Sequence, residues 1–179
     1  QEARRQRQMC IRDSLLGAGA DPSLYKEGNL SPLQIVLQQE PFNHELFSLM
    51  LEKSRKSDAM LAVLLQHAVV AGRKEVVELM LQHGVSVNHV VSKGESLLYH
   101  AIDKGKTEIA TLLLEKGADI SLTGSSGILP MEIALRRGNY AVIRMLLEKG
   151  ANPDVKTSEG YSLAEMAVYK GFPTYWNCC

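Results

Sequence analysis

Gly105-Lys-Thr107 is a candidate for phosphate chemistry, because Gly-Lys-Thr ends the loop in which backbone N–H groups and a lysine hold nucleotide phosphates. The complete motif needs another glycine five residues before the second one, and that position is His100. It must also follow a strand, whereas Gly105 falls in a turn between two predicted helices. We therefore expect no phosphate-binding loop here.

Histidines and cysteines, the usual metal ligands and nucleophiles, are scattered along the chain. They are His44, His67, His83, His89 and His100, with Cys10, Cys178 and Cys179. No histidine pair has the His-Glu-x-x-His spacing, and the adjacent cysteines are too close for the usual zinc-ligand spacing. We expect structural roles for all five histidines; His83 stands at a predicted helix end, where it interacts well with the helix dipole. The sequence predicts no metal and no cofactor.

Carboxylates fall on predicted helix faces rather than in an enclosed pair. Glu75 and Glu78 lie beside Arg73 and Lys74, which is typical of a solvated surface cluster and not of general acid–base catalysis. A cysteine nucleophile would need a base near it, and none is indicated. We expect that the chain is not an enzyme.

The composition excludes further classes. The chain has 179 residues, with 20 Lys plus Arg and 20 Asp plus Glu, so its formal net charge is zero. Nucleic acid is not an expected partner, because phosphate binding needs a net basic face. The longest apolar run, Ala59–Leu65, is far below the roughly 20 residues that span a bilayer. Three cysteines build no disulfide framework, so we expect a reducing compartment, the cytoplasm or the nucleus. We also expect the chain to be a monomer.

The elements that position these residues form an internal repeat. Gly84, Gly117 and Gly150 stand 33 residues apart, and each closes a similar apolar segment. A second series of positions keeps almost the same period, with steps of 32 or 33 residues: Ser31, Val63, Ser96, Leu129 and Ser162. Two independent series with one period identify an array of repeats.

Each repeat is predicted to hold two short helices. In the second helix, apolar residues at i, i+1, i+4 and i+5 form one stripe, as in Val142, Ile143, Leu146 and Leu147. The first helix of each repeat is expected to begin near the residue of the second series, and where that residue is a serine it can cap the helix. Glycines mark the inter-helix turns, at Gly72, Gly105, Gly138 and Gly171. The connection from Ser54 to Val63 is three residues shorter than its equivalents, which predicts a trimmed loop.

The period, the helix pairs and the Gly-Ala-Asp turn resemble the ankyrin repeat. The turn recurs in Gly19-Ala-Asp-Pro22, Gly117-Ala-Asp-Ile120 and Gly150-Ala-Asn-Pro153, and Ser31-Pro-Leu-Gln34 is similar to the family's Thr-Pro-Leu-His tetrapeptide. The resemblance implies an all-α, helix-turn-helix solenoid with short finger loops. The tetrapeptide's histidine is absent from every unit; its positions hold Gln34, Gln66, Tyr99, Glu132 and Glu165.

We expect the array to cover residues 15–179, with units near 29–54, 61–91, 92–124, 125–157 and 158–179. Residues 1–14 are expected to be non-native or disordered, because Arg5–Ser14 resembles a translated sequencing adapter; the alternative is a genuine basic terminal helix. The segment 171–179 looks like the opening of another second helix. Neither end offers the polar cap that arrays need, which indicates a piece of a longer protein.

The resemblance implies that partner proteins bind the concave face, formed by the first helices and the fingers. Residues before the inter-helix turns are expected to face that groove, and so are finger residues. The candidate partner-binding residues are Asp103, Lys104, Arg136, Arg137, Tyr169 and Lys170 near the turns, with Lys93, Glu95, Ile128 and Tyr161 in the fingers.

Four of these residues, Lys104, Arg136, Arg137 and Lys170, would form a basic strip that binds an acidic or mixed-charge segment of another protein. The alternative is that Asp103, Glu132 and Glu165 neutralise the strip. We expect a non-catalytic scaffold or adaptor for protein–protein recognition. The competing hypothesis is a regulatory or targeting array of a larger enzyme, such as a kinase or a ubiquitin-ligase subunit.

Overall fold

The computed structural model describes residues 32–38, 42–53, 58–90, 94–124, 127–157 and 159–171. In these ranges the chain is helical, apart from turns and two isolated β-bridges, which join Val90 to Ser96 and Lys156 to Ser162. The helices are α2 (Pro32–Leu37), α3 (His44–Lys53), α4 (Asp58–Ala71), α5 (Lys74–Gln82), α6 (Leu97–Asp103), α7 (Thr107–Glu115), α8 (Pro130–Arg137), α9 (Tyr140–Glu148) and α10 (Leu163–Tyr169).

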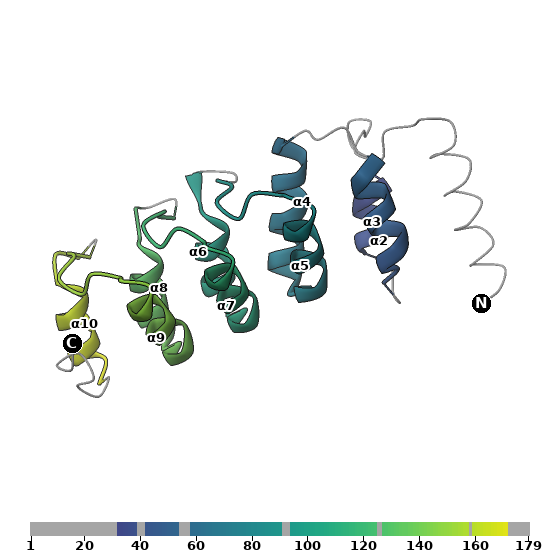
Figure 1. The fold of residues 1–179 in the computed structure, drawn as a ribbon. Helices are drawn as coiled ribbons and strands as arrows, with labels where there is room; N and C mark the ends of the chain where they lie inside the picture. Colours follow the sequence, from purple (N-terminus) through teal and green to yellow (C-terminus); the bar gives the residue numbers. More distant parts are fainter. Residues whose placement is uncertain are drawn as a thin grey trace. The chain divides into compact units, whose positions relative to one another are not determined.

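The chain divides into two compact units. The N-terminal unit is Gln1–Ala68 with Glu75–Val85, and the C-terminal unit is Val69–Lys74 with Ser86–Cys179. Within the N-terminal unit, α2 packs against α3. Within the C-terminal unit, α6 packs against α7 and α8 against α9, so each first helix lies on its own second helix (Figure 1).

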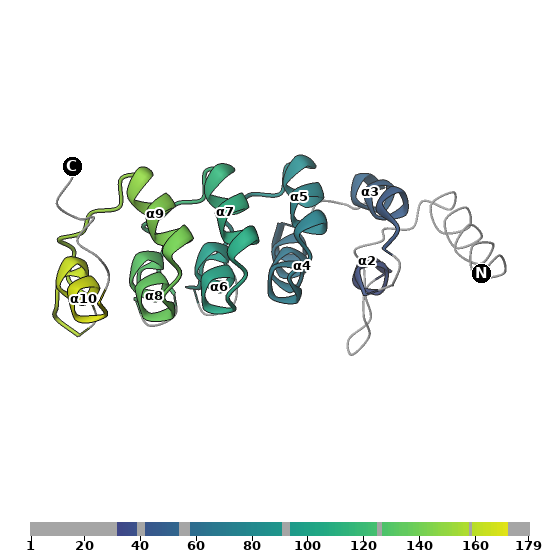
Figure 2. The same ribbon diagram turned by 90° about the horizontal axis from the view of Figure 1, so that it is seen from below.

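Successive repeats of the C-terminal unit stack helix on helix. The first helices α6, α8 and α10 form one row, and the second helices α7 and α9 form another (Figure 2). This is the all-α helix-turn-helix repeat that the sequence predicts. Since helices of seven to nine residues are unstable alone in water, packing between neighbouring repeats must stabilise them.

The apolar stripes of the second helices are buried in the core, as predicted, together with side chains of the first helices. In α9 the side chains of Val142, Ile143 and Leu146 are buried, and the equivalent Ile109, Ala110 and Leu113 are buried in α7. Each fully buried large aliphatic side chain contributes about 1.5–3 kcal/mol relative to an exposed one.

Glycines end the helices where the sequence predicts it. Gly138 has φ 68° and is the C-cap of α8, and Gly150 has φ 86° after α9. These left-handed conformations are strained for any residue with a Cβ atom. The predicted turns at Gly72, Gly84, Gly105, Gly117 and Gly171 also have positive φ.

Most first helices begin at the expected residues. Ser96 and Ser162 are N-caps whose hydroxyl groups accept hydrogen bonds from Tyr99 N and Glu165 N, and Leu129 precedes Pro130 in the first turn of α8. The start expected near Val63 is wrong, because α4 already begins at Asp58. The segment 58–71 holds no glycine or proline, so helix replaces part of the expected loop.

Several predictions fall outside the described residues. They concern residues 1–14, the cap Ser31, the finger residue Lys93, the three cysteines and the segment 172–179. Among the helices that are described, none combines the length and the apolar character that crossing a membrane requires.

Candidate functional site

The predicted partner-binding residues occupy two rows of the C-terminal unit. One row lies where the first helices end: Asp103 and Lys104 at α6, Arg136 and Arg137 at α8, and Tyr169 and Lys170 at α10. The other row precedes the first helices and contains Glu95, Ile128 and Tyr161. Repetition of the same unit therefore places chemically different side chains at equivalent positions along one face.

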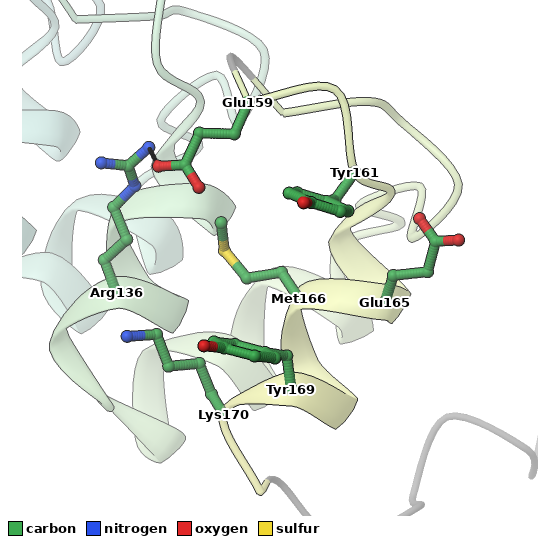
Figure 3. A pocket seen from close by; sticks show the side chains of 7 residues that line it. All are labelled: Arg136, Glu159, Tyr161, Glu165, Met166, Tyr169 and Lys170. Atoms are coloured by element: carbon green, nitrogen blue, oxygen red, sulfur yellow. Dashed lines mark hydrogen bonds and ion pairs between the residues drawn. The ribbon is translucent and has the colours of Figure 1, made fainter.

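The structure brings four of these residues together in one pocket of about 600 Å³ (Figure 3). Arg136 comes from α8, Tyr161 precedes α10, and Tyr169 and Lys170 lie at the C-terminal end of α10. Three more residues complete the lining: Glu159, Glu165 and Met166. We call this space the α8–α10 pocket.

Two tyrosines dominate the rim of the α8–α10 pocket. Tyr161 is 59% exposed and Tyr169 is 88% exposed, whereas Met166 between them is buried. Met166 was not among the candidate residues, although the sequence holds a signal for it. It stands three residues before Tyr169 on a predicted helix, a spacing that places two side chains on one face.

A second, shallower hollow of about 460 Å³ lies beside the inter-helix turns. Its lining includes the candidates Asp103, Lys104 and Arg137, together with Gly105, Thr107, Gly138, Asn139 and Tyr140. Asn139 Nδ2 donates to Thr107 Oγ1 at 2.8 Å and so links the two neighbouring turns. Glu95 and Ile128 line neither space.

Carboxylates pair with three of the four cations in the expected basic strip. Arg136 Nη2 lies 2.7 Å from Glu132 Oε1 and 2.8 Å from Glu159 Oε1. Asp103 contacts both Arg137, at 2.6 Å, and Lys104, at 3.0 Å. Of the carboxylates that were expected to neutralise the strip in the alternative hypothesis, Asp103 and Glu132 do pair with its cations. Glu159 is a further carboxylate that pairs with Arg136.

The fourth cation differs from the others. Within the part of the chain that the structure describes, the Lys170 ammonium forms no ion pair. Glu165, which was expected to help neutralise the strip, instead caps α10: its Oε2 accepts a hydrogen bond from Ser162 N at 2.7 Å. This bond and the one to the Ser162 hydroxyl lower the pKa of Glu165. The Ser-x-x-Glu spacing is the sequence signal for this capping box.

The pKa of Asp103 is lowered as well. The hydrogen bond from Arg137 is the main cause, and the hydrogen bond and charge of Lys104 act in the same direction, while partial burial opposes them. Asp103 is therefore ionised at neutral pH and holds two cations. The charged side chains that line the second hollow, Asp103, Lys104 and Arg137, therefore form ion pairs with one another.

The finger residue Glu95 has a structural contact. Its Oε2 lies 2.8 Å from Nε2 of His100, and both side chains are largely buried. The adjacent Tyr99 ring lies so close to Gly124 that a Cβ atom there would come within 2.7 Å of it. Burial, followed by the charges of Asp103 and Glu95, raises the pKa of Tyr99.

His83, in the N-terminal unit, also makes structural contacts. Its Nδ1 lies 2.9 Å from the backbone oxygen of Leu79, and its Nε2 lies 2.9 Å from Ser48 Oγ. Because a carbonyl oxygen only accepts, Nδ1 carries the proton toward Leu79. Among the described residues no group of three His, Cys, Asp or Glu side chains could hold a metal ion.

Comparison with known proteins places this geometry in a family. Residues 86–157 match a family model described as ankyrin repeats (3 copies), the stretch that contains α6, α7, α8 and α9. No curated protein matches the chain. The resemblance to ankyrin repeats that the sequence predicts is therefore confirmed over residues 86–157.

Proposed function

We propose that the chain is a non-catalytic adaptor or scaffold that binds partner proteins through the first-helix face of its C-terminal unit. Ankyrin repeats are generally protein–protein interaction modules. The observation that carries the proposal is the α8–α10 pocket, where two exposed tyrosines flank a buried methionine. Tyrosine is enriched among the residues that dominate binding energy at interfaces.

The polar surroundings support a protein partner. Interfaces combine an apolar centre with a rim of charged and hydrogen-bonding groups, and the Arg136–Glu159 ion pair lines the same pocket as the two tyrosines. Charges that are already paired within the chain cost less to cover than isolated ones. The face therefore suits a mixed apolar and polar surface better than a polyanion.

Affinity capture with matched variants tests this function. The full chain is the bait, and proteins bound from a lysate are compared among the wild type and three double variants. Tyr161→Ala/Tyr169→Ala alters the α8–α10 pocket, Lys104→Ala/Arg137→Ala alters the second hollow, and Arg144→Ala/Glu148→Ala removes an exposed ion pair on α9.

The proposal predicts a protein that the wild type and the α9 variant retain and that at least one of the other two variants loses. Circular dichroism must show that every variant keeps its helices. A protein retained equally by all variants, or lost only with the α9 variant, would contradict binding through the first-helix face.

A further inference from the structure

The charges of the α8–α10 pocket leave one cation without a counter-charge in the described chain. Arg136 is paired with Glu132 and Glu159. Lys170, on the same side of the pocket in Figure 3, makes no ion pair with any described residue. A partner that covers the pocket removes water from this ammonium group, which is costly unless the partner supplies a carboxylate.

The apolar part of the pocket lies directly beside Lys170. Tyr161 and Tyr169 project into the same space from the two sides of Met166 (Figure 3). A bulky apolar side chain inserted between these rings would contact Met166 and remove the exposed tyrosine faces from water. The volume of about 600 Å³ accommodates such a side chain together with the adjoining backbone.

We infer that the α8–α10 pocket binds a short segment of a partner protein in which a bulky apolar side chain stands close to an aspartate or glutamate. The apolar side chain lies between Tyr161 and Tyr169, and the carboxylate pairs with Lys170. This inference rests on the proposed function, and it adds the chemistry of the segment that is recognised.

A single carboxylate fits better than an acidic run. The other cations along this face, Lys104 and Arg137, already contact Asp103. Additional carboxylates over the α8–α10 pocket would meet Glu159, which lines it beside Arg136. Like charges brought together in this way oppose binding and give specificity against polyacidic segments.

A basic segment fits less well. Glu159 Oε1 already accepts from Arg136, and Glu165 is held by Ser162 and points away from the tyrosines in Figure 3. A cationic side chain would therefore have to displace Arg136 from Glu159, and it would be repelled by Lys170.

Selection from a phage-displayed library of random twelve-residue peptides tests the inference on the full chain. We expect enriched peptides that share a large apolar residue within a few positions of Asp or Glu. A fluorescent copy of the enriched peptide is then titrated with the wild type, Tyr169→Ala, Lys170→Ala and Lys149→Ala. Lys149 is the matched control, because it is also an exposed helix C-cap and lies outside the pocket.

Tyr169→Ala and Lys170→Ala should each weaken binding about tenfold or more, and Lys149→Ala should leave it unchanged. Replacing the peptide's Asp or Glu by the amide should weaken binding to the wild type by a similar factor and have little further effect with Lys170→Ala. This coupling identifies the contact, since general damage to the fold would not depend on the peptide's carboxylate.

Three results would overturn the inference: enriched peptides with basic or uncharged consensus sequences, equal binding by Lys170→Ala and the wild type, or no enrichment at all. The proposed function has its own readout. If affinity capture finds a partner that Lys104→Ala/Arg137→Ala loses and Tyr161→Ala/Tyr169→Ala retains, the chain is still an interaction module and only the inference about the α8–α10 pocket fails.

Discussion

Arg136, one turn after Glu132 on α8, places its Nη2 2.7 Å from Oε1 of Glu132. The side chain of Glu132 is only 2% exposed. A charge buried to this extent needs a partner, because removing it from water costs several kcal/mol. Arg136 also reaches Glu159 in the next finger. It therefore joins two neighbouring repeats while it lines the α8–α10 pocket.

Replacing Arg136 should cost stability as well as binding. Arg136→Ala leaves the Glu132 carboxylate buried without this cation, and we expect the free energy of unfolding to fall by about 2 kcal/mol. Since Arg137 is 53% exposed, Arg137→Ala should cost below about 1 kcal/mol. Urea denaturation measures both.

The double variant Arg136→Ala/Glu132→Gln separates the two causes of this loss. Removing the buried charge should recover part of the stability that Arg136→Ala loses. If the double variant is as unstable as the sum of the two single variants, the ion pair is not what holds this region together.

Thr157 should tolerate loss of its hydroxyl group. Its Oγ1 is buried and has no hydrogen-bond partner among the described residues, whereas its backbone N–H donates to Tyr161 O at 2.7 Å. Thr157→Val keeps the shape and removes the unsatisfied oxygen, so stability should stay constant or rise by up to about 1 kcal/mol.

Thr107→Val is the matched control for this change, because Thr107 Oγ1 accepts a hydrogen bond from Asn139. We expect Thr107→Val to lower the free energy of unfolding by about 1 kcal/mol. Urea denaturation of both variants and the wild type measures the two changes. Equal losses in the two variants would mean that the Thr157 hydroxyl is bonded after all.

Gly124 should be intolerant of any side chain while Tyr99 is present. A Cβ atom at this position would lie 2.7 Å from the Tyr99 ring, so Gly124→Ala forces the half-buried ring to move and should cost about 1–3 kcal/mol. A double-mutant cycle with Tyr99→Ala measures the clash directly. The cost of Gly124→Ala should largely vanish in the Tyr99→Ala background; an undiminished cost would point to the backbone instead.

Acid should remove the contribution of Asp103. Because its pKa is lowered in the folded chain, the stability it adds is complete above its unfolded pKa, near 4, and is lost as the pH falls through the folded value. The stability difference between the wild type and Asp103→Asn should therefore be constant near neutral pH and shrink below about pH 4. Thermal unfolding across this range measures it.

Arg137→Ala provides the control for this pH dependence, since Arg137 is the main cause of the lowered pKa. In that background the acid-dependent part of the difference should be smaller. A pH dependence that is unaltered by Arg137→Ala would contradict the assignment.

Features that depend on local chemistry could be predicted from the sequence. Ser96 and Ser162 cap their helices, and Gly138 and Gly150 end theirs, because capping and left-handed turns are properties of a few adjacent residues. The start of α4 at Asp58 could not be found this way. The spacing between equivalent positions of successive repeats does not determine whether the residues between them form a loop or extend a helix.

The candidate site was predictable by position and less so by charge. The turn and finger positions are correctly located at Arg136, Tyr161 and Tyr169, because repetition fixes where each element ends. The partner Glu159 lies 23 residues from Arg136, in the following finger, and the distance between them depends on how two repeats pack. Formal charges counted along the sequence therefore suggested a more basic surface than the folded chain presents.

Hydrogen–deuterium exchange of the full chain, alone and with its captured partner, tests the central claim most directly. The account predicts slower exchange on binding in the ends of α8 and α10, over residues 136–138 and 159–171, with α7 and α9 little changed. Protection confined to α7 and α9, or no protection anywhere in the C-terminal unit, would contradict recognition through the first-helix face.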